Sequence, residues 1–205
     1  MSEQYNVITA MAAFLLAILF PIYWVGEFWH IAESGGAAVY RNVSTLSLSD
    51  LLFLLNGVLG VLVYLGIKRF LNERYAFSKA DVVFVLLVIV TAVFTVGTLA
   101  MDATLHFYGD QLFLGWHVAT LNGVTVSLIV SLVVFGILDL ILGVMLLSNA
   151  KEMSGGVVAF AIITIIQGVV EFTVIFSLTT IVVYPIALLV IGIVMLIKPQ
   201  ELEVV

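Results

Sequence analysis

Cysteine is absent from this chain of 205 residues, and charged residues are scarce. Without a thiol, the chain has no disulfide, no thiolate metal ligand and no cysteine nucleophile, so any metal site must use nitrogen and oxygen ligands. Charged residues make up 10% of the chain, whereas a soluble domain has about a quarter. The net charge of −6 argues against a nucleic-acid partner, which would require basic patches.

Long apolar segments are abundant instead, and hydrophobic residues make up 63% of the chain. A helix that crosses the hydrocarbon core of a bilayer needs roughly 20 mostly apolar residues. Six segments have this character, at residues 7–30, 51–70, 82–101, 121–147, 156–176 and 179–197. The sequence therefore predicts an all-α integral membrane protein, with six transmembrane helices in a single domain over residues 1–205.

The basic residues predict how this bundle is oriented. Four of the seven lysines and arginines lie between the second and third segments, at Lys68, Arg69, Arg74 and Lys79. Connections rich in lysine and arginine remain in the cytoplasm. Alternation of the six segments then places both ends of the chain in the cytoplasm. We expect the membrane to be a bacterial inner membrane or an archaeal cell membrane.

All three histidines fall at the predicted outer boundary of the membrane, each with a carboxylate nearby. Glu27 and His30 are three residues apart, and Asp102 and His106 are four apart. Each pair therefore lies on one face of a helix. His117 ends the loop that follows the second pair. These side chains are candidate metal ligands.

Acidic residues also occur inside the apolar segments. Glu171 lies one turn beyond Gln167 in the fifth segment, and Asp139 lies near the middle of the fourth. A charged side chain inside a membrane costs roughly 2.5 to 3.5 kcal/mol on insertion scales, so each acid needs a partner, a proton or a metal ion. We expect Glu171 at a depth similar to that of the histidines, with Gln167 beside it.

The same residues also have a structural interpretation. Glu27 and Asp102 could be solvated carboxylates at the interface. The histidines could belong to an ordinary aromatic belt formed by Trp24, Trp29, Tyr108 and Trp116.

The ligand types favour particular metals. Imidazole and carboxylate without thiolate suit copper, iron or zinc, and the Glu-x-x-His spacing of Glu27 and His30 recurs in di-iron carboxylate bundles. Haem is less favoured, because only His30 and His106 stand at matched depth for ligation by two histidines. The chain has no Gly-x-Ser-x-Gly motif to support nucleophilic catalysis.

The segment Asp102-Ala103-Thr104-Leu105-His106, followed by Asp110 and then His117, resembles the metal-binding segment of the C subunit of particulate methane and ammonia monooxygenases. In that family an Asp-x-x-x-His pair, a short acidic loop and a second histidine bind copper within the membrane. The resemblance implies that Asp102, His106 and His117 bind copper. Gln167 and Glu171 occupy about the place of the family's later Asn-x-x-x-His pair, with glutamine and glutamate instead.

Three functions remain open at this point. The leading one is a copper-binding subunit of a membrane oxidoreductase, with Glu27 and His30 as added or supporting ligands. With little mass outside the bilayer, such a subunit would need other membrane subunits or further copies of itself. The second is a small ion channel or proton-coupled transporter in which Asn56, Asp139 and Glu171 line a polar path. The third is a structural subunit of a membrane complex.

Overall fold

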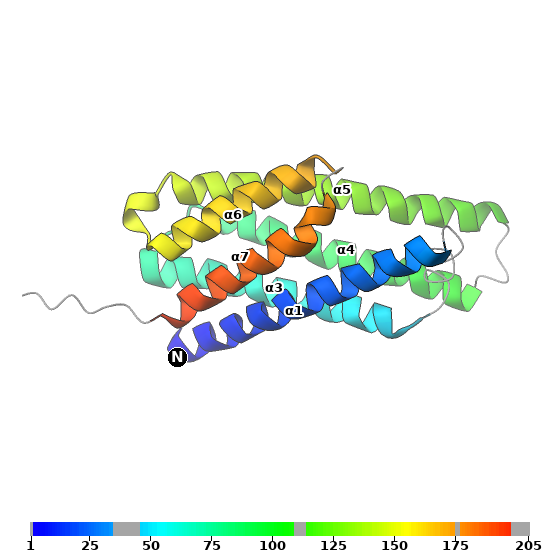
Figure 1. The fold of residues 1–205 in the computed structure, drawn as a ribbon, viewed down its shortest axis with the longest axis horizontal. Coiled ribbons are helices and arrows are strands. Elements are labelled where there is room, and N and C mark those ends of the chain that lie inside the picture. The colour runs from blue at the N-terminus through cyan, green and yellow to red at the C-terminus, as the bar shows by residue number, and fades with distance from the viewer. Residues whose placement is uncertain (1, 35–45, 109–113, 175–176, 198–205) are drawn as a thin grey trace, which may run out of the picture.

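The computed structural model describes residues 2–34, 46–108, 114–174 and 177–197. Within these ranges all regular structure is helical: α1 (Ser2–Ser34), α3 (Leu48–Tyr75), α4 (Asp81–Tyr108), α5 (Leu114–Leu147), α6 (Gly155–Phe172) and α7 (Thr180–Leu196). Two short 3-10 helices, η2 (Ala150–Glu152) and η3 (Ser177–Thr179), precede α6 and α7. The long helices lie side by side along one axis (Figure 1). The predicted all-helical fold is confirmed for this part of the chain.

Five of these helices are long and apolar enough to cross a membrane, as in an integral membrane protein. They contain the stretches Gln4–Trp29, Leu48–Tyr75, Asp81–Tyr108, Thr125–Leu147 and Gly155–Phe172. The apolar helix α7 is shorter, with 17 residues. At 1.5 Å per residue it is about 26 Å long, slightly less than a hydrocarbon core of about 30 Å. The sixth predicted span stays a prediction.

The predicted boundaries differ from those of the helices by up to five residues at one end of the bundle and by up to seven at the other. α4 continues past residue 101 to Tyr108, and α5 begins at Leu114 rather than at residue 121. Hydropathy marks where the chain leaves the hydrocarbon, but a helix can continue beyond that point while its backbone hydrogen bonds can form. Residues 101–108 contain no glycine or proline, and Gly109 follows them.

The helix α6 instead ends early, at Phe172 rather than at the predicted residue 176. Val174 has a φ of 54°, in the left-handed region. A β-branched residue rarely adopts this conformation, so the sequence gives no sign that the helix stops here. Both α6 and α7 are much shorter than α1 and α5, and they end well short of the right-hand end of the bundle in Figure 1.

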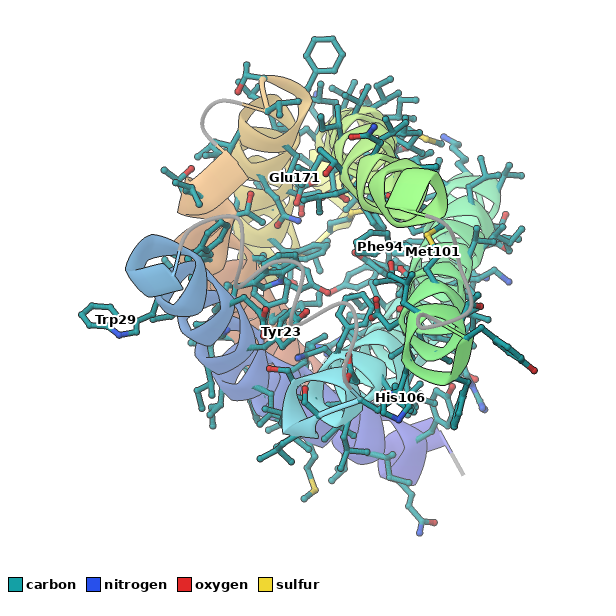
Figure 2. The ribbon with its side chains drawn as sticks, turned by 90° about the vertical axis from the view of Figure 1, so that its right-hand side faces the viewer. Tyr23, Trp29, Phe94, Met101, His106 and Glu171 are labelled. Atoms are coloured by element: carbon teal, nitrogen blue, oxygen red, sulfur yellow. The ribbon has the colours of Figure 1, made fainter. Side chains whose placement is uncertain are left out.

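The six long helices form a closed ring. Each packs mainly on its neighbours in chain order, from α1 through α3, α4, α5 and α6 to α7, and α7 packs back on α1. Figure 2, which looks along the bundle, shows the helices arranged around a common centre. A ring of this kind places one face of every helix toward a shared interior.

The outer surface of the ring is apolar as well. On α1 the exposed side chains include Met11, Ile18, Ile22 and Val25, spaced to lie along one face. Both the core and the outside of the bundle are therefore hydrophobic, as expected of a helical bundle whose solvent is lipid.

Positive charge collects at one end of the bundle, which we call the basic end. Every lysine and arginine in the described part of the chain lies there: Lys68, Arg69, Arg74, Lys79 and Lys151. α1 begins and α7 ends at this same end (Figure 1). The predicted topology, with both ends of the chain in the cytoplasm, stays a prediction.

Candidate functional site

The interior of the ring holds a cavity of about 170 Å³, which we call the central cavity. All six long helices contribute to its wall. Most of the lining is aromatic or aliphatic, and the polar side chains that interrupt it are Tyr23, Asn56, Tyr64, Thr91, Thr95, Ser131, Gln167, Glu171, Thr180 and Tyr184. Concave apolar sites with a few placed polar groups are the usual form of small-molecule sites in proteins.

Glu171 is the acidic residue in the wall of the central cavity. Its side chain is 5% exposed, and its Oε1 accepts a hydrogen bond of 3.1 Å from Nε2 of Gln167, one turn earlier on α6. Its Oε2 is buried and has no hydrogen-bond partner among the described residues. In Figure 2, Glu171 lies on the side of α6 that faces α5. The carboxyl group therefore keeps one oxygen available to a proton or a ligand.

A second, much smaller space, the inner pocket, lies beyond the central cavity. Its volume of about 10 Å³ is close to the lower limit for a single water molecule. Asp139 of α5 lines it and is 3% exposed. Tyr64, Gln167 and Tyr184 line both spaces. These three side chains separate Asp139 from the central cavity.

The two tyrosines of this partition are neighbours. The hydroxyl group of Tyr64, on α3, lies close enough to that of Tyr184, on α7, for the two to interact. Asp139 and Glu171 both lie near enough to act electrostatically on the two hydroxyl groups and on each other. The interior thus holds one cluster of buried polar groups, formed by Asp139, Tyr64, Tyr184, Gln167 and Glu171.

A separate acidic group lies at the end opposite the basic end. Ser49 donates a hydrogen bond of 2.6 Å to Oε1 of Glu27, which ties the start of α3 to α1. The carboxyl group of Asp102, on α4, lies within hydrogen-bonding reach of that of Asp50. Asp50 also closes the capping box at the start of α3 by accepting a hydrogen bond of 2.6 Å from the backbone of Ser47.

The predicted copper ligands fall at this opposite end. Asp102 is buried, with 6% of its surface exposed, and His106 lies one turn further along α4 on an exposed position beside Phe107. His117 lies in the first turns of α5 and His30 near the end of α1, but their side chains fall outside the described part of the structure, as does the whole of Asp110. Among the described residues, no three histidine, cysteine or acidic side chains lie together so that they could hold one metal ion. The three-ligand site stays a prediction.

The remaining predicted ligands are grouped differently from the expectation. Glu171 and Gln167 accompany Asp139 and the tyrosine pair in the interior, whereas Glu27 and Asp102 lie near Tyr23 and Asp50. α6 ends well short of the end of α4 that bears His106 (Figure 1). The structure therefore describes two separate acidic groups.

Sequence analysis did not identify Tyr23, Tyr64 and Tyr184 as site residues. Their positions do provide a sequence signal for Tyr64 and Tyr184, because tyrosines in membrane helices are usually found at the membrane interfaces. Tyr64 and Tyr184 instead lie inside predicted apolar segments, six residues before the end of the second and five residues after the start of the sixth. A tyrosine hydroxyl at such depth needs a hydrogen-bond partner inside the protein.

The fold and the cavities together define a helical membrane bundle that encloses buried carboxyl groups. No lysine, arginine or histidine is among the described residues that line either space. Comparisons with protein-family models, with curated proteins and with solved structures find no match to this chain. Arguments about function therefore rest on the residues themselves.

Proposed function

We propose that this protein is a proton-coupled membrane transporter whose substrate site is the central cavity. The observation that carries the proposal is the cluster of buried polar groups that contains Asp139 and Glu171 inside a ring of apolar helices. Acidic residues at membrane depth are rare and mark proton or ion pathways when they face the interior of a bundle.

The two acids have complementary positions for this role. Glu171 has an oxygen without a hydrogen-bond partner among the described residues and lines the substrate-sized cavity. Asp139 lies beyond Tyr64 and Tyr184, next to a space about the size of one water molecule. Hydroxyl groups and a water between two carboxyl groups can pass a proton from one to the other. Protonation of one acid can therefore depend on the occupancy of the cavity beside the other.

Proton movement in reconstituted vesicles tests this proposal. We expect vesicles loaded with a pH-sensitive dye to acidify faster with the protein than without it when a potential is imposed by potassium and valinomycin together with a gradient of a small solute. Asp139→Asn and Glu171→Gln each remove an ionisable group but conserve size, and both should reduce the rate to that of empty vesicles. Glu152→Gln, at an exposed position in η2, is the matched control and should keep the full rate.

Two outcomes would count against the transporter. One is wild-type protein that moves no protons above the empty-vesicle rate, both alone and with gradients of cationic, anionic and neutral small solutes. The other is unchanged proton movement in Asp139→Asn and Glu171→Gln, which would place the pathway elsewhere.

A copper centre on Asp102, His106 and His117, in a subunit of a membrane oxidoreductase, is our second proposal. One observation favours it. Oδ1 of Asp102 is buried without a hydrogen-bond partner among the described residues, one turn from His106. A carboxylate oxygen and an imidazole four residues apart on a helix can bind one metal ion.

A further inference from the structure

Part of the wall of the central cavity is a connected set of aromatic rings. On α1, the ring of Trp24 lies 5.2 Å from that of Tyr23 and 6.0 Å from that of Phe28, measured between ring centres. The ring of Phe53 on α3 lies 5.5 Å from Tyr23 and 5.5 Å from Phe94 of α4. Figure 2 shows Tyr23 and Phe94 directed toward the middle of the ring of helices. We call these five side chains the aromatic wall.

The ionisable side chains described in the lining of the central cavity can carry negative charge but not positive charge. Glu171 is buried in its wall with Oε2 unpartnered among the described residues, and the lining includes no lysine, arginine or histidine in that part of the chain. The faces of aromatic rings carry partial negative charge, so they attract cations. A ligand that occupies the cavity therefore lies within a wall that contains both a carboxyl group and aromatic rings.

From this geometry we propose that the central cavity binds an organic monocation that carries a single aromatic ring, with its ammonium group at Glu171 and its ring against the aromatic wall. This inference rests on the proposed transporter and names the class of its substrate. An anion would be repelled by Glu171 in its ionised form. An inorganic cation would need several oxygen ligands, which a mostly apolar wall does not provide.

The volume of the cavity sets the size of the ligand. An engineered cavity of about 150 Å³ in another protein holds benzene. The central cavity, at about 170 Å³, can therefore accept one ring with a small substituent. Bulky cations with several rings should not fit without expansion of the helix ring.

A pair of probes with nearly the same shape isolates the contribution of charge. Phenyltrimethylammonium and tert-butylbenzene differ at one atom, a cationic nitrogen in place of a neutral carbon. We expect the purified protein in detergent to bind the cation at least about tenfold more tightly than the neutral probe, because an ionised Glu171 in a low-dielectric site attracts the cation but not its neutral counterpart. Isothermal titration calorimetry measures both affinities. Equal affinities, or stronger binding of the neutral probe, would overturn the inference.

Variants assign the selectivity to particular side chains. Glu171→Gln should lose most of the preference for the cation while tert-butylbenzene still binds, which shows that the cavity is intact. Trp24→Phe should retain cation binding, and Trp24→Leu should weaken it by about 2-fold to 30-fold. Trp29→Leu is the matched control, because Trp29 is 64% exposed and points away from the bundle in Figure 2. A full preference for the cation in Glu171→Gln would contradict the assignment.

Failure of this inference can be distinguished from failure of the transporter. The titration is an equilibrium measurement without a gradient, whereas proton movement in vesicles is measured without the probe. Vesicles that move protons through Asp139 and Glu171, combined with no selectivity for the cation, would reject the substrate class alone. Selective binding without any proton movement would reject the transporter and leave a cation-binding protein.

Discussion

Gly168 of α6 lies so close to Gly136 of α5 that neither position has space for a side chain. A Cβ atom on Gly168 would stand 2.7 Å from the carbonyl oxygen of Gly136, and one on Gly136 would stand 2.8 Å from the carbonyl oxygen of Gly168. Glycine pairs let the backbones of membrane helices approach closely. This contact brings together the two helices that carry Asp139 and Glu171.

Gly168→Ala should therefore destabilise the bundle. The added methyl group meets backbone atoms rather than a flexible side chain, and overpacking of this kind costs typically about 1–3 kcal/mol. Thermal unfolding in detergent, followed by the loss of the monodisperse peak in size-exclusion chromatography, measures the effect. Gly97→Ala on α4 is the control, because nothing lies within 4 Å of its Cβ position. Equal melting temperatures for the two variants would show that the α5–α6 contact is looser than described.

Arg74 should stabilise the end of α7 from the end of α3. Its Nη1 donates to the carbonyl oxygens of Ile197 at 2.8 Å and Val194 at 3.3 Å, where the last carbonyl groups of a helix have no partner within the helix. Arg74→Gln should lower the stability by about 1.5–3 kcal/mol, the typical range for a hydrogen bond to a charged group. Lys151→Gln, at an exposed position in η2, should change it by less than about 0.5 kcal/mol.

The measurement for Arg74 is again thermal unfolding in detergent, together with hydrogen exchange of the backbone at the end of α7. Faster exchange there in Arg74→Gln but not in Lys151→Gln would locate the effect. Unchanged exchange and stability in both variants would mean that the contact contributes nothing.

The absence of cysteine makes the orientation easy to test, because single cysteines can be introduced without removing any. Ser78→Cys lies at the basic end, in the connection between α3 and α4, and Leu46→Cys lies just before α3 at the opposite end. Since basic connections remain in the cytoplasm, an impermeant maleimide should label Leu46→Cys on intact cells. It should label Ser78→Cys only after the membrane is permeabilised. The reverse pattern would invert the orientation.

Metal analysis of the purified protein tests the copper proposal. After incubation with copper and removal of the excess, we expect about one copper ion per chain, and His106→Ala or His117→Ala should remove most of it. Thr104→Ala is a control on the same helix, since the Thr104 hydroxyl is exposed and binds the carbonyl oxygen of Ala100 within α4. The six-helix fold should persist in all three variants. Equal copper in the histidine variants and the wild type would reject the site, as would no copper in the wild type.

Much of the fold follows from hydropathy, because each long helix coincides with a predicted apolar segment. The connection between α3 and α4 was predicted within a few residues on both sides, since Lys68 to Lys79 interrupt the apolar pattern there. The far ends of α4 and α5 were not predicted, because residues such as Ala103 and Leu105 form a helix equally well in lipid and in water. The end of α6 was missed because a valine adopts a backbone conformation that it usually avoids.

The interior of the site was predicted only in part. Glu171 and Asp139 stood out because an acid is costly in an apolar helix. Their separation from Asp102 and Glu27 depends on the short length of α6 and on how each helix is rotated in the ring. Neither property can be predicted from a residue pattern in a single sequence. Asn56 was expected on the polar path, and it does line the central cavity, although its Nδ2 donates to the carbonyl oxygen of Leu52 on its own helix. The tyrosine pair joins α3 to α7 across more than a hundred residues, beyond the reach of any local motif.

The contact between α1 and α7 makes the order of synthesis matter. The ribosome synthesises α1 first, and α1 can pack against α7 only after this last helix has been synthesised. Until then the ring has a missing wall, and the positions of Tyr184 and Thr180 in the lining are empty. The carboxyl group of Glu171 thus enters the membrane facing an open side of the bundle. A nascent chain that stops before Thr180 would contain every carboxyl group discussed above but no enclosed compartment, so partial products of translation would be unable to bind the ligand of the finished protein.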